Sequence, residues 1–174
     1  MQVIDWQIII KEHGPVVWNT AYRLLGNFAD AADCFQDTFI CALKVCESQK
    51  VRNFSALLTR LTTTRAIDQL RRRFRREQNN IILDEGTVSS DSDPVKCVQQ
   101  QELAVQLQKA LVQLPLQEAQ VFCLRYLNDM SYRRISKELN IKTNAVGVLL
   151  HRAKEKLRKS FSPLSNQQKS EVVL

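Results

Sequence analysis

The chain has 174 residues, enough for one ordinary domain or two small ones and too few for a large multi-domain enzyme. Its 44% hydrophobic and 25% charged residues match a globular protein, and only 4 Gly and 4 Pro argue against an all-β fold. The formal net charge of +7 indicates a polyanionic partner, such as nucleic acid or an anionic surface.

The sequence lacks the usual signals for membrane insertion, metal binding and catalysis. The aliphatic run Ile8–Ile10 is far shorter than the roughly 20 residues of a membrane span, so we expect a cytoplasmic protein. There is no zinc-ligand spacing, phosphate loop or nucleophile motif, and so we expect no metal, no cofactor and no enzyme activity. Reduced, mostly buried thiols are expected at Cys34, Cys41, Cys46, Cys97 and Cys123.

A first helix is predicted over Val16–Leu25, ending at Gly26, because glycine suits the left-handed turn after a helix. Asn27 is a favourable N-cap for a second helix, with Asp30 placed as in a capping box. Two sets of residues then recur at helical spacing, and each lies on a different face of the predicted second helix. The apolar row is Phe28, Ala32, Phe35, Phe39, Ala42, Leu43 and Cys46, and the acidic row is Asp30, Asp33 and Asp37.

A long third helix is predicted from Phe54 to about Arg76. Five of the six residues in Arg71–Arg76 are arginine, which exceeds what the helix dipole needs. The helix also contains four threonines, which either bond back to carbonyls one turn earlier or present their hydroxyls to a ligand. These are Thr59, Thr62, Thr63 and Thr64.

A segment rich in Asp, Ser, Gly and Pro follows, and residues 81–101 contain four acidic residues and one basic residue. It predicts a flexible acidic linker over 79–98 between domains at 1–78 and 99–174. In the second domain, one helix has Leu103, Leu107, Leu111 and Leu114 facing inward, and Pro115 starts the next, over Gln117–Leu127. Capping by Ser131 and Thr143, with a tight turn at Asn140, predicts a helix-turn-helix with a basic second helix.

Two groups of segments carry a family resemblance. The first group is Leu114–Pro115, Leu124–Tyr126, Ser131–Tyr132 and Leu150–Arg158, and the second is Asp30–Asp33 with Gln36–Phe39, followed by Ala66–Asp68 and the arginine run. The first group resembles the fourth domain of bacterial RNA polymerase sigma factors, a helix-turn-helix, and the second group resembles their second domain, a helical bundle. The two-domain layout resembles the small extracytoplasmic-function (ECF) class of these factors. The resemblance implies an all-α protein of two small helical domains that directs RNA polymerase to promoters.

The resemblance also implies site residues. Core polymerase, through the clamp helices of its largest subunit and its flap, is the implied partner, and the clamp surface comprises Asp30, Asp33, Gln36, Asp37 and Phe39. Promoter DNA is the second partner, and its −10 element is contacted by Asn53, Thr64, Arg65, Asp68, Gln69, Arg71, Arg72 and Arg73. The −35 element is contacted by Arg133, Lys142, Thr143, Asn144, Ala145, Val148, His151 and Arg152.

The last helix departs from the family pattern at four positions where the family commonly has polar or basic side chains. These positions are Ala145, Gly147, Val148 and Leu149. Hydrogen bonding to bases is correspondingly weakened. Two alternatives therefore stay open, a stand-alone helix-turn-helix regulator and a polymerase- or anti-sigma-binding module with weakened −35 recognition. An anti-sigma partner is common in the family, but no residue of this sequence identifies one.

Overall fold

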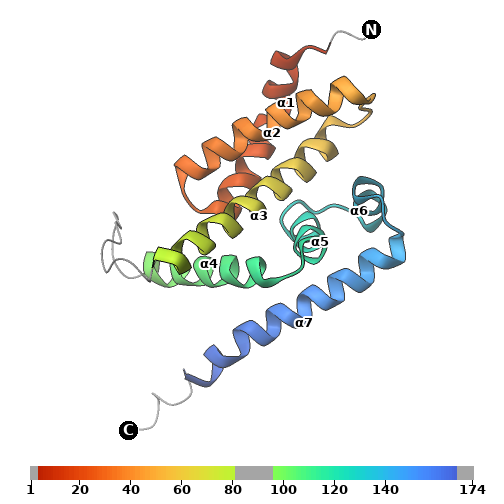
Figure 1. Ribbon diagram of the computed structural model, residues 1–174. Helices are drawn as coiled ribbons and strands as arrows, with labels where there is room; N and C mark the ends of the chain where they lie inside the picture. The colour runs from red at the N-terminus through yellow and green to blue at the C-terminus, as the bar shows by residue number, and fades with distance from the viewer. Residues whose placement is uncertain (1–3, 81–95, 168–174) are drawn as a thin grey trace.

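The computed structural model describes residues 4–80 and 96–167, which form seven α-helices and no strands (Figure 1). The predicted all-α class is confirmed. Most of the predicted linker, residues 81–95, lies outside the described residues, whereas residues 79–80 and 96–98 at its two ends are helical.

The N-terminal half consists of α1 (Trp6–Leu25), α2 (Phe28–Ser48) and α3 (Phe54–Asn80), each packed against the other two. Helix α1 begins well before its predicted start because Asp5 caps it, accepting hydrogen bonds from two backbone N–H groups. Pro15 lies inside this helix, although proline is typically found at the first position of a helix.

The turn between α1 and α2 has the predicted capping. Gly26 adopts φ 76°, and its N–H donates to the carbonyl of Tyr22 at 2.9 Å. The Asn27 Oδ1 accepts from the Asp30 N–H at 2.8 Å, and the Asn27 Nδ2 donates to the Asp30 carboxylate at 2.7 Å. These bonds satisfy groups that the ends of both helices leave free, so the chain reverses within two residues.

The buried face of α2 differs from its predicted apolar row. The residues of α2 in the core are Ala31, Cys34, Thr38, Phe39 and Ala42. Phe28 and Leu43, which belong to the predicted row, are exposed instead. All of these buried side chains except Phe39 are small, and small side chains let α2 lie close to its neighbours.

The C-terminal half consists of α4 (Lys96–Gln113), α5 (Leu116–Tyr126), α6 (Tyr132–Leu139) and α7 (Thr143–Gln167). Ser131 caps α6, as predicted, and Asn140 takes the left-handed turn with φ 52°. Helix α7 begins at Thr143 itself, whose hydroxyl donates to the Ser136 Oγ at 3.3 Å. Leu103, which is predicted to face inward, is exposed, whereas Leu107 and Leu111 of α4, and Leu114 just after it, belong to the core.

The two halves lie against each other and share their hydrophobic core. Helix α5 packs against α3 (Figure 1), and one buried cluster joins residues of α1, α2 and α3 to residues of α4, α5 and α7. Its members include Leu24, Leu25, Ile67, Leu70, Leu111, Leu114, Cys123 and Leu157. The described conformation is therefore one in which the two predicted domains are in direct contact.

Candidate functional site

The predicted polymerase-binding residues of α2 fall into three environments. Asp33, Gln36 and Asp37 are exposed on one side of the helix. Asp30 is half-buried and bonded within the protein. Phe39 is only 7% exposed and belongs to a core cluster shared with α1 and α3. The predicted contact of Phe39 with polymerase stays a prediction, and in the described conformation the ring lies on the side of α2 that faces α1 and α3.

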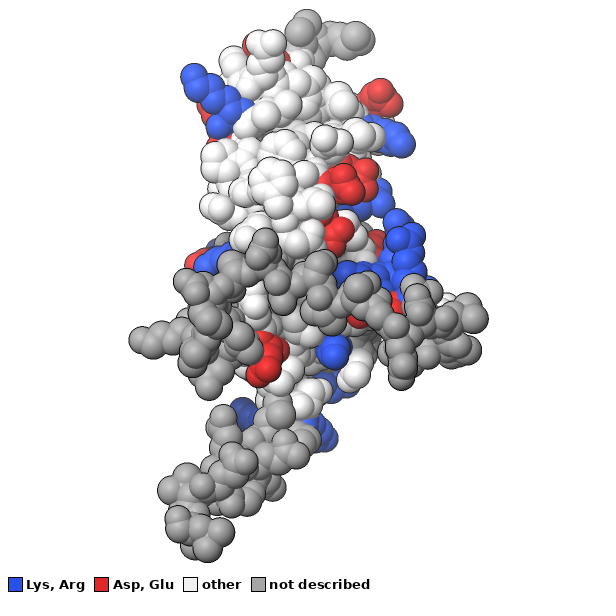
Figure 2. All heavy atoms as spheres, turned by 90° about the vertical axis from the view of Figure 1, so that its left-hand side faces the viewer, with Lys and Arg blue, Asp and Glu red and all other residues white. Residues whose placement is uncertain are grey.

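An extended apolar surface adjoins the acidic residues of α2. Its exposed side chains are Ile10, Tyr22, Phe28, Ile40 and Leu43. Phe28 is 71% exposed, and its ring centroid lies 5.1 Å from that of Trp18 in α1. Figure 2 shows this broad uncharged area over α1 and α2, with acidic side chains along its edge. Exposed apolar patches of this kind are typical of protein-binding surfaces.

A groove of about 400 Å³ runs between α2 and α3 and brings two predicted sets together. The acidic residues of α2 line it together with several residues predicted to contact the −10 element. The latter are Arg65, Asp68, Gln69, Arg72 and Arg73. Acidic side chains of α2 therefore face basic side chains of α3, and part of the charge of each set is directed at the other.

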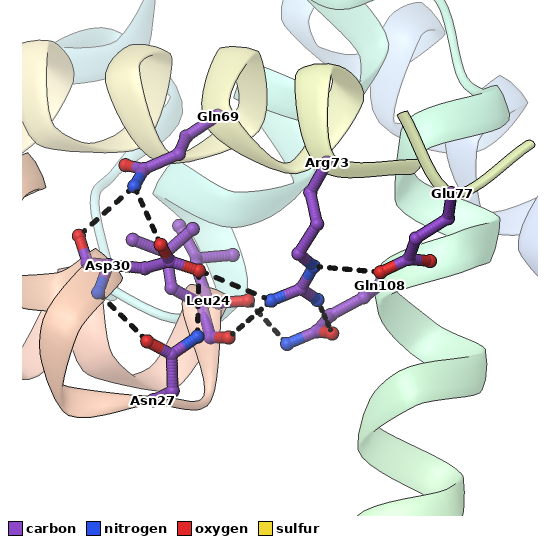
Figure 3. Close-up of polar contacts among 8 residues, drawn as sticks. Leu24, Asn27, Asp30, Gln69, Arg73, Glu77 and Gln108 are labelled. Atoms are coloured by element: carbon purple, nitrogen blue, oxygen red, sulfur yellow. Dashed lines mark hydrogen bonds and ion pairs between the residues drawn. The ribbon is translucent and has the colours of Figure 1, made fainter. Parts of the chain in front are cut away.

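Two of these α3 residues are bonded to Asp30 (Figure 3). The Gln69 Nε2 donates to the Asp30 Oδ1 at 3.3 Å, and the Arg73 Nη1 lies 3.5 Å from the Asp30 Oδ2. The Arg73 Nε also lies 3.8 Å from the Glu77 carboxylate. In this conformation Gln69 and Arg73 serve the packing of α2 on α3, and neither side chain is free to contact DNA.

Gln108 of α4 connects this network to the C-terminal half. Its side chain is 5% exposed, its Oε1 accepts from the Arg73 Nη2 at 2.6 Å, and its Nε2 donates to the Leu24 carbonyl at 2.8 Å (Figure 3). The bond to Leu24 satisfies a carbonyl at the end of α1, where helical partners are lacking. Sequence reasoning missed Gln108, since α4 contains several glutamines and nothing local distinguishes this one.

Two further −10 residues are bonded to the C-terminal half. The Arg71 Nη2 donates to the Leu114 carbonyl at 2.7 Å. The Thr64 hydroxyl donates to the Arg60 carbonyl at 2.8 Å and accepts from the Gln120 Nε2 at 3.0 Å. Thr64 and Arg71 therefore become available to another ligand only when the halves separate.

The hydrogen bonds of the other threonines of α3 show whether their hydroxyls bond back to the helix or are presented to a ligand. The hydroxyls of Thr59 and Thr62 each donate to the carbonyl four residues earlier, at 2.7 Å. The Thr63 hydroxyl is buried and has no hydrogen-bond partner in the described part of the chain. Back-bonding thus accounts for three of the four threonines, including Thr64.

Asn53 and Arg72 differ from the rest of the −10 set because both are exposed. The Asn53 Oδ1 accepts from the Ala56 N–H at 2.9 Å, so this side chain helps begin α3. Arg72 lies on the groove side of α3 beside two other exposed arginines, Arg75 and Arg76. Asn53 and Arg72 are therefore the exposed members of the −10 set in the described conformation.

The predicted −35 residues are brought together at the start of α7. Exposed positions four and eight residues apart share one side of a helix, and Asn144, Val148 and Arg152 have this spacing. Val146 and Leu150 are buried on the opposite side, against the rest of the helix-turn-helix. The remaining members are exposed or half-buried, namely Arg133 on α6 and Lys142, Thr143, Ala145 and His151.

The described cysteines are free thiols, and burial raises the pKa of both Cys34 and Cys123 to about 12. Among the described residues, no group of His, Cys, Asp and Glu side chains is arranged to hold a metal ion. Every helix in the described ranges is too short or too polar to cross a membrane.

Comparison with known proteins identifies the family. Residues 9–76 match the family model for sigma-70 region 2, and residues 104–157 match that for sigma-70 region 4. The chain is 31% identical over 169 residues to the ECF RNA polymerase sigma factor SigW of Bacillus subtilis, covering 90% of this chain and 88% of SigW. The chain belongs to the ECF sigma factor family.

Other relatives agree with this assignment. The sigma factor is 30% identical over 164 residues to the ECF RNA polymerase sigma factor SigE of Mycolicibacterium smegmatis, covering 94% of this chain but 64% of that longer protein. Among solved structures, it resembles the sigma factor RpoE of Bartonella quintana in complex with the anti-sigma factor NepR, with a TM-score of 0.56 and 19% identity. That match covers 91% of this chain and 97% of RpoE, and it supports the same fold.

Proposed function

We propose that this ECF sigma factor binds core RNA polymerase, directs it to a two-part promoter and helps to open the −10 region. The protein acts by binding, without catalytic residues of its own, in the cytoplasm where promoter DNA lies. Residues 1–78 form the polymerase-binding and −10 domain, residues 79–98 the linker and residues 99–174 the −35 domain. The observation that carries the proposal is that regions 2 and 4 match in order within one chain.

The exposed face of α2 is the proposed polymerase-binding surface. Asp33 and Asp37 border the apolar area that includes Phe28 and Leu43. An apolar surface supplies most of the binding free energy, while an acidic edge selects a basic partner and orients it during encounter. The clamp helices of the polymerase are the proposed occupant of this surface.

The test is the affinity of the purified protein for core RNA polymerase at two salt concentrations. The charge-reversal variant Asp33→Arg/Asp37→Arg is expected to lower the affinity at least tenfold, because both carboxylates are exposed on the proposed surface. A matched control is Glu12→Arg/Glu155→Arg, which changes the net charge equally at exposed positions of α1 and α7. Equal losses of affinity in the two variants would show that this face of α2 is not part of the interface with polymerase.

Contact with the −10 element is proposed for α3 and the loop before it. Arg72 is exposed, and its replacement by alanine in the polymerase-bound protein should lower promoter affinity and reduce the salt slope by about one unit for each phosphate that is no longer neutralised. Thr64 and Arg71 are bonded to the C-terminal half, so their proposed contacts require the halves to separate first. Polymerase binding is the proposed cause of that separation.

Contact with the −35 element is proposed for the exposed side of α7, which is poor in groups that read bases. Asn144 supplies an amide, Val148 a methyl surface for thymine, and Arg152 a phosphate contact. A duplex binding assay should therefore show strong salt dependence and modest sequence preference. The same assay separates a stand-alone regulator, which binds duplex without polymerase, from an interaction module, which does not bind it at all.

An anti-sigma factor is a further proposed partner. The structural relative RpoE was solved in complex with one. The apolar area of α1 and α2 offers a surface on which such a protein would compete with polymerase. Replacing the exposed Phe28 with serine should weaken both interactions together. An effect on polymerase binding alone would show that the two partners use different surfaces.

A further inference from the structure

A basic cleft of about 870 Å³ lies where the two halves of the protein meet. One side is formed by the loop between α2 and α3 together with α3, and the other by α6 and the residues flanking it. Six of the lining residues are basic, with three on each side, and Glu138 is the single acidic one. The basic residues are Lys50, Arg52, Arg60, Arg133, Arg134 and Lys137.

Packing the two halves brings these like charges together, and the protein compensates little of the charge itself. The Arg60 Nε lies 3.7 Å from the Glu138 carboxylate, which is beyond hydrogen-bond distance. That nitrogen is buried and has no hydrogen-bond partner in the described residues. The Arg60 side chain as a whole is 27% exposed and lines the cleft, so an anion there would compensate a positive charge that Glu138 pairs with only loosely.

The chemistry of the lining selects the kind of anion. Arginines bind phosphate oxygens through paired N–H donors, and lysines bind them as point charges. Sites for single-stranded nucleic acid add aromatic rings on which bases stack, and no aromatic side chain is among the described residues that line this cleft. The lining therefore suits a run of phosphates and offers no stacking surface for bases.

We infer that this cleft binds a linear polyphosphate anion held between the two halves of the protein. The inference goes beyond the proposed sigma function, which assigns no small ligand to the chain. An anion that contacts both sides binds only the packed arrangement and so stabilises it by mass action. Asn53 and Arg133 also line the cleft and belong to the proposed DNA contacts, so a bound polyphosphate would oppose promoter binding.

The test is calorimetric titration of the purified protein with inorganic tripolyphosphate at fixed ionic strength. One anion is expected to bind per chain. The single variants Arg52→Gln and Lys137→Gln, one on each side of the cleft, should each weaken binding at least threefold, and the double variant at least tenfold. Both residues are exposed or half-buried, and circular dichroism verifies that the variants fold.

The matched control is Lys44→Gln/Lys159→Gln, which removes one exposed lysine from each half outside the cleft. This control should change the affinity by less than twofold. An equal loss in the control and the cleft variant would indicate a diffuse basic surface and overturn the inference, as would an absence of binding. A loss from only one of the two single variants would refute a site shared between the halves.

Two further titrations test the chemical class. Adenosine triphosphate should bind no more tightly than tripolyphosphate, because the cleft offers no ring for the base. A short single-stranded oligonucleotide with the same number of charges should also bind no more tightly. A clear preference for either would mean that the cleft recognises bases, and the assignment to polyphosphate would be wrong.

Discussion

Gln108 is the residue whose replacement should release the C-terminal half from the N-terminal half. Its buried side chain forms two hydrogen bonds across the interface, accepting from the Arg73 guanidinium at 2.6 Å and donating to the Leu24 carbonyl at 2.8 Å. A hydrogen bond to a charged group contributes about 1.5–3 kcal/mol, and an unpaired buried carbonyl costs about 1–3 kcal/mol. Because water enters the space that alanine leaves, we expect Gln108→Ala to weaken the interface by about 2–4 kcal/mol.

The measurement is hydrogen exchange of backbone amides in α4 and in the part of α3 that α4 covers. With 1.4 kcal/mol per factor of ten, exchange through the open state should accelerate about 30- to 700-fold. The control Gln101→Ala removes the same groups from an exposed position on the same helix and should leave exchange unchanged. The core cluster of Ile9, Val17 and Leu58 lies within the N-terminal half and should keep its protection.

A second variant separates the two hydrogen bonds of Gln108. Gln108→Glu keeps an acceptor for Arg73 but places a carboxylate oxygen against the Leu24 carbonyl, so acceleration smaller than in Gln108→Ala indicates that the Arg73 bond dominates. Unchanged exchange in both variants would show that the bonds of Gln108 contribute little and that apolar packing, with the bonds of Arg71 and Thr64, holds the halves together. Equal acceleration throughout both halves would indicate that the variant unfolds globally and that Gln108 does not control a local interface.

Three other predictions concern stability and reactivity. Gly26→Ala should destabilise the protein by about 1 kcal/mol in denaturant unfolding, because φ 76° strains any side chain; an unchanged midpoint would mean that the turn adapts. Lys156→Met should lower the free energy of unfolding by about 1–3 kcal/mol in the same assay, because it removes the ammonium group that lies 2.8 Å from the buried Glu118 carboxylate. Adding Glu118→Gln to this variant should restore part of the lost stability. Cys34 and Cys123 should resist iodoacetamide at pH 8 while the protein is folded, because burial raises the pKa of each thiol to about 12, and both should react after denaturation. Mass spectrometry measures the labelling, and rapid labelling of the native protein would contradict this burial.

The features that could be predicted from the sequence are those decided by neighbouring residues. The turn at Gly26 and the caps at Asn27 and Ser131 each depend on chemistry within a few positions, and each forms as expected. The predicted start of α1 is too late because Pro15 is tolerated inside the helix, where its missing N–H is one cost among many contacts.

The features that could not be predicted depend on what each helix packs against. The burial of α2 follows from the approach of α1 and α3, and for this reason Phe28 is exposed although a periodic apolar row includes it. The candidate site depends on helix packing in the same way. The residue types show which side chains can bind DNA or protein, but not which of them already form bonds within the folded protein. Arg71 and Arg73 belong to one basic run, yet their bonds differ. Arg71 donates to a carbonyl of the C-terminal half, whereas Arg73 bonds both to Gln108 of that half and to Asp30 of the N-terminal half. The availability of Arg71 to DNA is thus determined by the contact between the halves, whereas Arg73 is held by Asp30 as well. A change at Gln108, distant in sequence from both, should alter the first and only part of the second.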